Sequence, residues 1–425
     1  MENVKICVIG LGYVGLPLAT LFAEKYPVVG YDINSKRINQ LKKKYDTTLE
    51  VDTNKLDFVL VDEIPEQKGL YCTYDYFDIK SSNFYIITVP TPVDEFNRPD
   101  LKPLLNASKL VGSVIKSGDV IVFESTVFPS ATEDYCVPKI EKESGLRYNI
   151  DFFVGYSPER VNPSDKVHTI DKIMKVTSGS TPEIADYVDN VYKSIITAGT
   201  HKASSIKVAE ASKIIENAQR DVNIAFMNEV AKIFNRLDIN TNDVLKASGT
   251  KWNFLPFKQG LVGGHCIGVD PYYLTQKALE LEYTPELIQA SRKINDSMGK
   301  YVADEVIRMM IINDLKIKNS NTLILGFTFK ENCTDFRNTK VVDIYNQLKY
   351  FGIDVDIYDP WASPSKVLSE YNIRLLDEIT YTYDAIILAV AHDEFKKINL
   401  NEHRLKNTVV YDVKGFFNED YVQYL

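Results

Sequence analysis

Three glycines near the N-terminus constrain the fold of this chain more than any other feature. Gly10, Gly12 and Gly15 form a G-x-G-x-x-G motif between an apolar run at 4–10 and a helical stretch at 16–25. In such a strand–turn–helix the first glycine allows the tight turn, the second admits a pyrophosphate, and the third lets helix and strand pack closely. The motif therefore predicts a doubly wound α/β domain with a nucleotide at the helix N-terminus.

The residue that would select the dinucleotide is Asp32, which ends the next apolar run. A carboxylate here accepts hydrogen bonds from the adenosine ribose and repels a 2′-phosphate, so it predicts NAD rather than NADP. Lys36 and Arg37 favour NADP instead, since nearby cations can bind the 2′-phosphate. Thr91 in TVPTP and Thr126 in EST follow the third and fourth apolar runs, where they could bond the ribose or the nicotinamide amide. The alternative for both threonines is a purely structural role, in which each caps a helix or forms part of a turn.

Apolar runs alternate with helical stretches at both ends of the chain. The runs are 4–10, 27–32, 83–90, 119–126 and 152–160 in the first part, and 321–329, 354–360, 384–390 and 407–413 in the last. Such alternation predicts parallel sheets covered on both faces. The middle is helical at about 204–237 and 285–313, with a loop rich in proline and glycine between them. We expect two Rossmann-like doubly wound α/β domains, 1–200 and 316–425, joined by a central, mainly helical domain, 201–315, with a long connecting helix.

Composition excludes several classes of function. The 425 residues exceed what one hydrophobic core supports, and a formal net charge of -9 disfavours nucleic acid as the main partner. No apolar run reaches the ~18 residues of a membrane span, and the apolar N-terminus runs directly into the glycine motif, unlike a signal peptide. Five cysteines without a C-x-x-C pair fit a disulfide framework poorly. We expect a cytoplasmic protein with reduced thiols, no membrane association and no metal site.

Cys266 is the residue best suited to covalent chemistry. It lies in GLVGGHCIGVDPYY (260–273), a polar, glycine-rich segment, whereas most cysteines are buried as small hydrophobic residues, as we expect of Cys7. A nucleophilic cysteine needs thiolate character and access. His265 is adjacent, but neighbours on an extended chain usually point apart, which disfavours it as the base. Asp270 could return toward the thiol through a turn.

The long helical stretch supplies groups that could work with this thiol. Lys213 and Asn217 lie four residues apart and share a face, and Arg220 continues it. Apolar neighbours would partly desolvate Lys213, which would favour a role as general acid or base. The alternative is an ordinary solvated lysine on the surface. Alcohol oxidation by hydride transfer gives an aldehyde, thiolate addition and a second hydride transfer give a thioester, and water releases a carboxylate. Cys266, the Lys213/Asn217 pair and Asp270 can fill the roles of nucleophile, oxyanion stabiliser and water activator.

At these residues the chain resembles the UDP-glucose/GDP-mannose dehydrogenase family, and more closely its UDP-N-acetylhexosamine 6-dehydrogenase branch of the Vi polysaccharide type. The resemblance covers essentially the whole chain and rests on GLGYVGLP, VPTPVD, ESTVFP, YSPERV, AEASKIIEN, GGHCIGVDP and GFTFKENCTDFRNT, which appear in the family's order. It implies a four-electron oxidation at the 6-position of a UDP-sugar with two NAD per turnover. It also implies a role in surface polysaccharide synthesis, such as capsule or O-antigen, and a homodimer or higher homo-oligomer.

The resemblance also implies residue roles. For catalysis it implies Cys266 as nucleophile, Lys213 as acid/base and oxyanion partner, Asn217 as oxyanion donor, and Asp270 with Thr126 and Glu159 arranging water. Around the cofactor, beside the glycines, it implies Tyr13, Val14, Asp32, Arg37, Thr91 and Thr126. Around the nucleotide sugar it implies Arg160, Val161, Lys213, Asn217, Arg220, Gly263, Phe329, Lys330, Arg337 and Lys414.

Several details stay open. The family uses the loop before the cysteine to reach a neighbouring subunit's substrate; here TKWNFLPFKQ (250–259) offers Lys251 where some relatives have arginine. Arg337 could hold a diphosphate bidentately, with an ion pair to Glu331 or Asp335 as the alternative. The GGHC start favours an N-acetylhexosamine of the GlcNAc, GalNAc or ManNAc type over glucose.

Three other functions compete with this one. The first is UDP-glucose 6-dehydrogenase, which a substrate panel would separate. The second is a β-hydroxyacid dehydrogenase, which also has a Rossmann and a helical domain but needs no catalytic cysteine and no third α/β domain. The third is a non-enzymatic NAD-sensing scaffold, which would form no NADH with any nucleotide sugar.

Overall fold

The computed structural model describes residues 4–94, 97–161, 167–264 and 267–425. They form two compact units. The N-terminal unit holds the residues up to Glu216 together with Tyr272–Leu281, and the C-terminal unit holds Asn217–Pro271 and Glu282–Leu425. Helix α7 (Ile206–Arg236) contributes to both units, and the three-part division of the chain stays a prediction.

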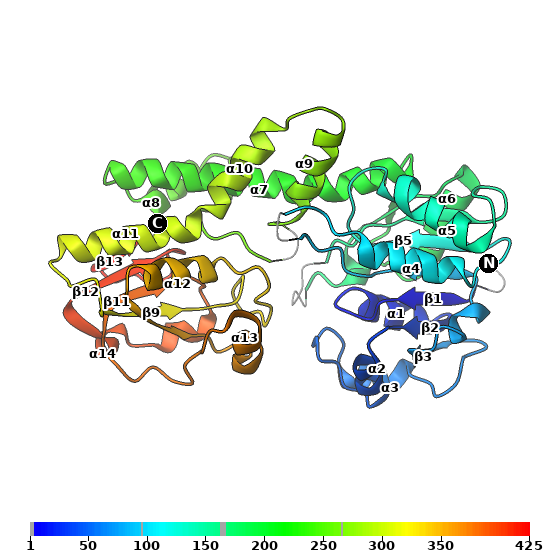
Figure 1. Ribbon diagram of the computed structural model, residues 1–425, viewed down its shortest axis with the longest axis horizontal. Coiled ribbons are helices and arrows are strands. Elements are labelled where there is room, and N and C mark those ends of the chain that lie inside the picture. The colour runs from blue at the N-terminus through cyan, green and yellow to red at the C-terminus, as the bar shows by residue number, and fades with distance from the viewer. Residues whose placement is uncertain (1–3, 95–96, 162–166, 265–266) are drawn as a thin grey trace. The chain divides into compact units, whose positions relative to one another are not determined.

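A six-stranded parallel sheet forms the centre of the N-terminal unit (Figure 1). Its order is β3-β2-β1-β4-β5-β6, and Ile6 of β1 pairs with Val28 on one side and Phe84 on the other. This is the order of a doubly wound dinucleotide-binding sheet, so the predicted fold class is confirmed. The strands are β1 (Ile6–Ile9), β2 (Pro27–Tyr31), β3 (Gly69–Thr73), β4 (Phe84–Ile87), β5 (Val120–Phe123) and β6 (Phe153–Tyr156).

Helices cover this sheet on both sides. Ile6 and Val8 point to one face and pack in a core with residues of α1, α3 and α6, whereas α4 and α5 lie side by side (Figure 1), with α4 against β4. The helices are α1 (Gly15–Ala23), α2 (Ser35–Lys42), α3 (Thr53–Val59), α4 (Lys102–Gly112), α5 (Val137–Ser144) and α6 (Pro182–Lys193). Short elements complete the unit: η1 (Asp78–Ser81), η2 (Thr132–Cys136), η3 (Ile170–Lys172) and the parallel pair β7 (Lys175–Thr177) and β8 (Thr200–Lys202).

The middle of the chain is helical as predicted, with one difference. The segment expected as one helix at 285–313 is two, α10 (Glu286–Asp296) and α11 (Met298–Ile312). They meet at Ser297, whose hydroxyl donates to the carbonyl of Ile294 (2.7 Å) and so competes with the backbone hydrogen bonds of a continuous helix. The helices α8 (Thr241–Ser248) and α9 (Asp270–Glu280) have no counterpart in the prediction.

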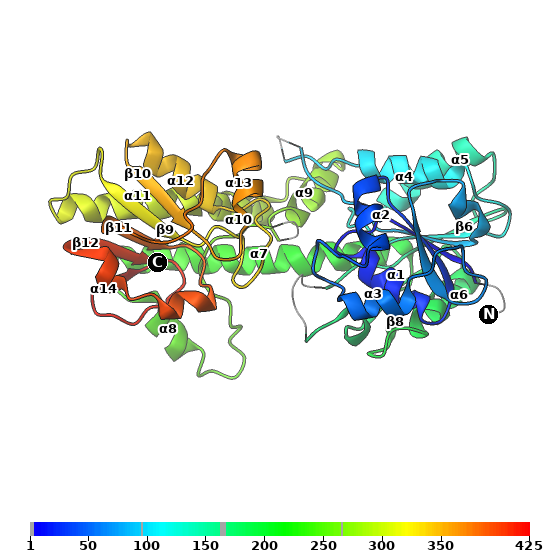
Figure 2. The ribbon, with the colours of Figure 1, turned by 90° about the horizontal axis from the view of Figure 1, so that it is seen from below.

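The C-terminal unit contains the second predicted parallel sheet, in the order β10-β9-β11-β12-β13. Ile324 and Ile387 face a core shared with α11 and α12, which lie side by side (Figure 2), while Leu323 and Leu325 face a second core with Phe395. The elements are β9 (Asn321–Leu325), α12 (Val341–Tyr350), β10 (Asp354–Tyr358), α13 (Pro364–Tyr371), β11 (Tyr383–Leu388), η4 (Asp393–Lys397), α14 (Leu400–His403), β12 (Arg404–Asp412) and β13 (Val422–Tyr424).

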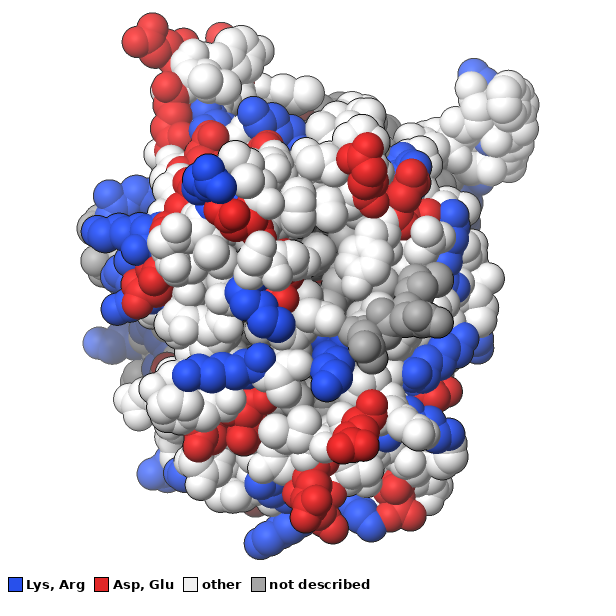
Figure 3. Space-filling model, turned by 90° about the vertical axis from the view of Figure 1, so that its right-hand side faces the viewer, with Lys and Arg blue, Asp and Glu red and all other residues white. Residues whose placement is uncertain are grey.

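Charged side chains of both signs are interspersed on the face drawn in Figure 3, which looks onto the N-terminal unit, so neither sign dominates it. Among the described residues, no helix combines the length and the apolar character that crossing a bilayer requires.

Candidate functional site

The glycine turn forms a cradle that side chains would fill. A Cβ on Gly15 would come within 1.8 Å of the carbonyl oxygen of Gly10, whereas a Cβ on Gly12 would meet no atom within 4 Å. Helix α1 begins at Gly15 without a side-chain cap, so the positive end of the helix dipole faces this turn. At the end of β2, the Asp32 carboxylate accepts a hydrogen bond from the N–H of Leu11 (2.9 Å) and so lies beside the turn. These residues fit a dinucleotide.

Arg37 is held beneath this turn by an acidic partner. Its guanidinium donates to the carbonyl of Leu11 (2.9 Å) and pairs with buried Asp46 (2.7 Å), while one terminal nitrogen, Nη2, is buried with no partner among the described residues. Burial opposes the charge of Asp46, but hydrogen bonds from Thr48, from the N–H of Val51 and from Arg37 hold the pKa of Asp46 below its usual value. In Arg37, Nη2 is therefore the nitrogen left uncommitted, while Nε and Nη1 are engaged by Leu11, Thr47 and Asp46.

A hollow of about 720 Å³ in the N-terminal unit brings four of the predicted site residues to one place. Tyr13 and Val14 reach it from the glycine turn, and Glu159 and Val161 from the YSPERV segment after β6. Two predicted cofactor residues, one predicted catalytic residue and one predicted sugar residue therefore line the same hollow.

The carboxyl ends of β1, β4 and β5 are tied to one another. Thr88 donates from its hydroxyl to the carbonyl of Gly10 (2.7 Å), and Ser125 donates to the carbonyl of Val89 (2.6 Å). Since the chain order of the sheet reverses between β1 and β4, this is the edge where such sheets bind ligands. The predicted Thr91 and Thr126 lie, half-buried, in these same loops.

Tyr273 holds the loop of Thr91 from helix α9. Its hydroxyl donates to the carbonyl of Thr91 (2.8 Å), and the ring is completely buried. Sequence reasoning missed this residue, because the partners lie 182 positions apart and the YY pair after Asp270 carries no local signal.

Glu159 belongs to a buried charge cluster. Lys175 lies between the carboxylates of Glu124 (2.7 Å) and Glu159 (3.0 Å), while Glu159 also accepts from the N–H groups of Arg160 (2.7 Å) and Val161 (2.6 Å). Burial opposes all three charges. The carboxylates nevertheless raise the pKa of Lys175, and Lys175 with the two N–H groups lowers the pKa of Glu159, whereas burial raises the pKa of Glu124. Glu159 is thus held ionised and orders the YSPER turn.

Helix α7 presents Lys213 from a buried position, and a second buried residue of the helix holds the loop after β5. Glu210 accepts hydrogen bonds from the N–H groups of Ser130 (2.6 Å) and Thr132 (2.9 Å). Burial raises the pKa of Glu210 to about 7. The loop that carries Thr126 is therefore attached to the helix that carries Lys213.

Farther along α7, Glu216 pairs with the predicted substrate residue Arg160 (2.8 Å). The next residue, Asn217, donates from its side-chain amide to the carboxylate of Asp270 (2.5 Å), so two of the predicted catalytic residues meet in the C-terminal unit. Arg220 on the same helix is exposed. The predicted nucleophile Cys266 and its neighbour His265 lie outside the described residues.

The segment that leads to Cys266 is anchored by a buried polar network. Asn228 on α7 both accepts from the N–H of Gly260 (2.8 Å) and donates to its carbonyl (3.0 Å). Asn228 also donates to Asn295 of α10, which donates to Asp221, the partner of Arg292 (2.5 Å). Sequence reasoning missed all four of these polar residues, since each reads locally as part of an ordinary helix.

The loop after β9 packs against this segment. A Cβ on Gly264, whose φ is +80°, would lie 2.8 Å from the Phe329 ring, and one on Gly263 would lie 3.2 Å from the Phe329 Cβ. Asn338 donates to the carbonyl of Gly264 (3.3 Å). The Lys414 side chain lies near Gly260. Of the predicted substrate residues, Gly263 thus lies within the segment that precedes Cys266, and Phe329 and Lys414 border it.

The remaining predicted residues are less closely gathered. Arg337 forms an ion pair with Asp335 (2.6 Å), one of the two partners considered from the sequence, and is about one-third exposed. Lys330 is half-buried and Lys251 is exposed. Within the ranges that the structure describes, no group of three or more His, Cys, Asp or Glu side chains could hold a metal ion.

Comparison with known proteins identifies relatives over the whole chain. Models of the UDP-glucose/GDP-mannose dehydrogenase family match with the NAD binding domain at residues 4–196, the central domain at 207–297 and the UDP binding domain at 323–419. The UDP-N-acetyl-D-glucosamine 6-dehydrogenase of Pseudomonas aeruginosa is 54% identical over 424 residues, 99% of each chain. The enzyme of the same name from Salmonella typhi is 51% identical over 100% of this chain and 96% of its own. The solved UDP-D-ManNAc dehydrogenase of Pyrococcus horikoshii superposes with a TM-score of 0.88 at 28% identity, covering 99% of both chains.

Proposed function

Because the chain belongs to the UDP-glucose/GDP-mannose dehydrogenase family, we propose that it is a UDP-N-acetyl-D-glucosamine 6-dehydrogenase, which oxidises the 6-hydroxymethyl group of this sugar to a carboxylate. The observation that carries the proposal is the hollow where Tyr13 and Val14 of the cofactor turn meet Glu159 and Val161 of the YSPERV segment. The choice of sugar is supported by relatives of that name at 54% and 51% identity, against 33% for a UDP-N-acetyl-D-mannosamine dehydrogenase from Methanococcus maripaludis.

When bound, NAD would supply the hydride acceptor for each of the two proposed oxidations, so two NAD would be consumed per sugar. Lys213, buried on α7, takes the proton of the 6-hydroxyl and stabilises the oxygen that forms, together with the amide of Asn217. The thiolate of Cys266 adds to the aldehyde to give a thiohemiacetal, whose oxidation leaves a thioester. Asp270 then directs water onto the thioester, which releases the carboxylate and returns the thiol.

The contact between Asn217 and Asp270 supports these roles. It links the helix that carries Lys213 to a position four residues after Cys266. Glu159 acts differently from a free base, since its carboxylate is committed to Lys175 and to two backbone N–H groups. We propose that Glu159 orients Arg160 and Val161 around the sugar.

We also propose a homodimer that works in the cytoplasm. Exposed apolar side chains on α7, namely Val208, Ile215, Phe226 and Ile233, would be covered by a second copy. A cytoplasmic location keeps Cys266 reduced, as a nucleophilic thiolate must be. Sedimentation would give a dimer mass, and a monomer at micromolar concentration would contradict this assembly.

The test of the function is a substrate panel. The purified protein is incubated with NAD and, in separate reactions, UDP-GlcNAc, UDP-GalNAc, UDP-ManNAc and UDP-glucose, while NADH is followed and products are weighed by mass spectrometry. We expect the largest kcat/KM with UDP-GlcNAc and a product that has gained one oxygen and lost two hydrogens. A clear preference for UDP-glucose would favour the main alternative, and the absence of NADH with all four sugars would contradict the proposal.

A further inference from the structure

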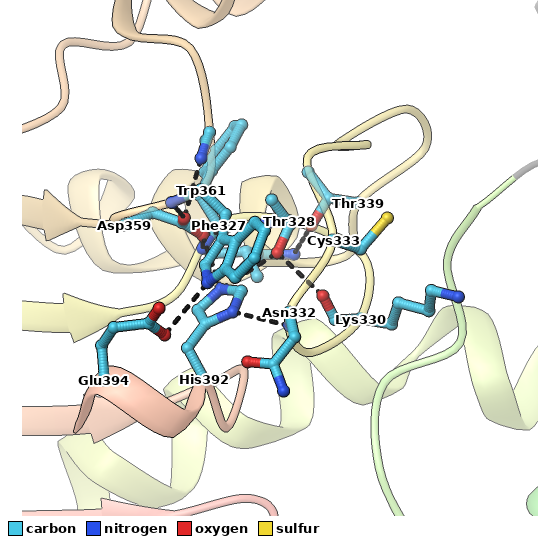
Figure 4. Close-up of polar contacts among 12 residues, drawn as sticks. Phe327, Thr328, Lys330, Asn332, Cys333, Thr339, Asp359, Trp361, His392 and Glu394 are labelled. Atoms are coloured by element: carbon cyan, nitrogen blue, oxygen red, sulfur yellow. Dashed lines mark hydrogen bonds and ion pairs between the residues drawn. The ribbon is translucent and has the colours of Figure 1, made fainter. Parts of the chain in front are cut away.

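Three loops meet at the carboxyl end of the C-terminal sheet, and a buried histidine connects them (Figure 4). Thr328 follows β9, Asp359 follows β10 and His392 follows β11. In the sheet, β10 lies on one side of β9 and β11 lies on its other side. The strand order therefore reverses between β9 and β11. This reversal is where open α/β sheets bind their ligands, and His392 lies at it.

The hydrogen bonds of His392 specify one form of its ring. Nδ1 accepts from the backbone N–H of Asn332 (2.9 Å), so it carries no proton. Nε2 faces the carboxylate of Asp359 (3.0 Å) and the hydroxyl of Thr328 (3.1 Å) and must therefore be the protonated nitrogen of a neutral imidazole. The side chain is completely buried.

Asp359 remains ionised in this cluster. It also accepts from the N–H groups of Phe327 (2.5 Å) and Thr328 (2.9 Å) and, through its other oxygen, from Trp361 (2.7 Å). Burial opposes its charge, but the hydrogen bond from His392 and the backbone N–H groups hold its pKa below the usual value. The negative charge of Asp359 beside Nε2 favours a proton on Nε2. This tautomer leaves Nδ1 to accept the hydrogen bond from the N–H of Asn332.

The partners of His392 flank the residues implied in substrate binding. Thr328 and Asn332 enclose Phe329 and Lys330, and the Thr328 hydroxyl also donates to the carbonyl of Lys330 (2.9 Å), as Figure 4 shows. The Phe329 ring in turn contacts Gly264, two residues before Cys266. One imidazole thus fixes both ends of a five-residue segment that borders the cysteine loop.

We propose that His392 is a positioning residue for the UDP moiety of the substrate: its neutral imidazole pre-organises residues 328–332 so that Phe329 and Lys330 meet the nucleotide in a fixed geometry. The inference rests on the proposed function in naming UDP as the ligand and Phe329 and Lys330 as residues that bind it. His392 itself touches no substrate. A buried histidine that merely stabilises the fold is the competing explanation, and the two predict different effects on binding.

Two substitutions separate the two hydrogen bonds. H392N keeps an oxygen near the place of Nδ1 and so keeps an acceptor for the N–H of Asn332, whereas H392Q keeps a donor near the place of Nε2 but removes the acceptor of that N–H. T328V removes the hydroxyl link to Lys330 and leaves the imidazole in place. H403Q changes a histidine on α14 of the same unit, where Nδ1 lies 3.3 Å from the carbonyl oxygen of Tyr381, and serves as the matched control.

The experiment measures the Kd of UDP by calorimetry and the KM values of UDP-GlcNAc and NAD for each full-length variant. We expect H392Q to weaken UDP binding about tenfold and T328V several-fold, H392N to stay within about threefold of the wild type, and the KM of NAD to change less than about twofold in all. H403Q should match the wild type.

The outcomes are distinguishable. If H392Q and T328V lower the melting temperature but leave the Kd of UDP unchanged, His392 only stabilises the fold and the inference is wrong. If UDP binding depends on His392 as expected but the wild type oxidises no UDP-sugar, the result supports the inference and contradicts the proposed function.

Discussion

The side-chain amide of Asn217 donates a hydrogen bond to the carboxylate of Asp270, across 53 positions of sequence. The first lies on the long helix α7 and the second opens α9, four residues past Cys266. This pair therefore connects the two segments to which the oxidation is assigned.

Removing the amide tests the oxyanion role. Asn217→Ala should lower kcat by about 100- to 1000-fold, the usual loss for one oxyanion donor, with little change in the KM of NAD. Asn223→Ala removes an exposed amide from the same helix and should leave kcat unchanged. A kcat for Asn217→Ala close to that of the wild type would refute the assignment.

Glu210 makes stability depend on pH. Burial raises its folded pKa from 4.5 to about 7, so the folded state retains a proton that the unfolded chain loses near its ordinary pKa. The contribution of Glu210 to stability is therefore complete below about pH 4.5 and is lost as pH rises through about 7, with a total on the order of 3 kcal/mol.

Glu210→Gln cannot ionise and should flatten the decline of melting temperature between pH 5 and 8. Glu229→Gln, at an exposed position of the same helix, should follow the wild-type curve. Parallel curves for the wild type and Glu210→Gln would contradict the role of burial.

The cluster around Lys175 is sensitive to the loss of its cation. Lys175→Met leaves the buried carboxylates of Glu124 and Glu159 facing one another and should lower the free energy of unfolding by about 3–5 kcal/mol. Adding Glu124→Gln to this variant should recover part of the loss. Lys193→Met, which removes an exposed lysine from its ion pair with buried Asp189, should cost less than Lys175→Met, because Asp189 keeps the hydrogen bond from Thr177 (2.7 Å). Both variants are measured by urea unfolding. Equal losses in the free energy of unfolding for Lys175→Met and Lys193→Met would contradict the stabilising role of Lys175 in the cluster.

Gly264 is constrained twice, by its backbone and by its neighbour. Its φ of +80° disfavours any side chain, and an alanine Cβ would lie 2.8 Å from the ring of Phe329. Gly264→Ala should therefore weaken UDP binding and lower kcat. Gly118→Ala has a similar φ of +92° but no atom within 4 Å, so it isolates the backbone cost and should reduce stability without affecting activity. If both variants retain wild-type activity, the packing of Phe329 on this loop is unimportant.

Much of the fold was predictable because its signals are local. The G-x-G-x-x-G motif and Asp32 lie within one strand–turn–helix–strand stretch, and the uninterrupted apolar spacing of α7 is visible in the sequence itself. The break at Ser297 was not predicted, since serine is tolerated inside helices and only the side-chain hydrogen bond to Ile294 distinguishes it.

The groups that support the site were harder to find. Lys175 stands among apolar residues in a three-residue strand and meets Glu124 across 51 positions, and His392 meets Thr328 across 64. Such pairings follow from the strand order, which no local pattern encodes. Asn217 and Asp270 were predicted as members of one catalytic set from the resemblance, but their direct hydrogen bond was not.

The central claim is a four-electron oxidation through Cys266, and the yield of NADH per molecule of UDP-GlcNAc consumed tests it most directly. The account predicts two NADH and one uronic acid for the wild type, the same for Cys72→Ala, which alters a buried thiol of β3, and no uronic acid for Cys266→Ala. One NADH per sugar, or a Cys266→Ala variant that still forms the acid at a comparable rate, would contradict it.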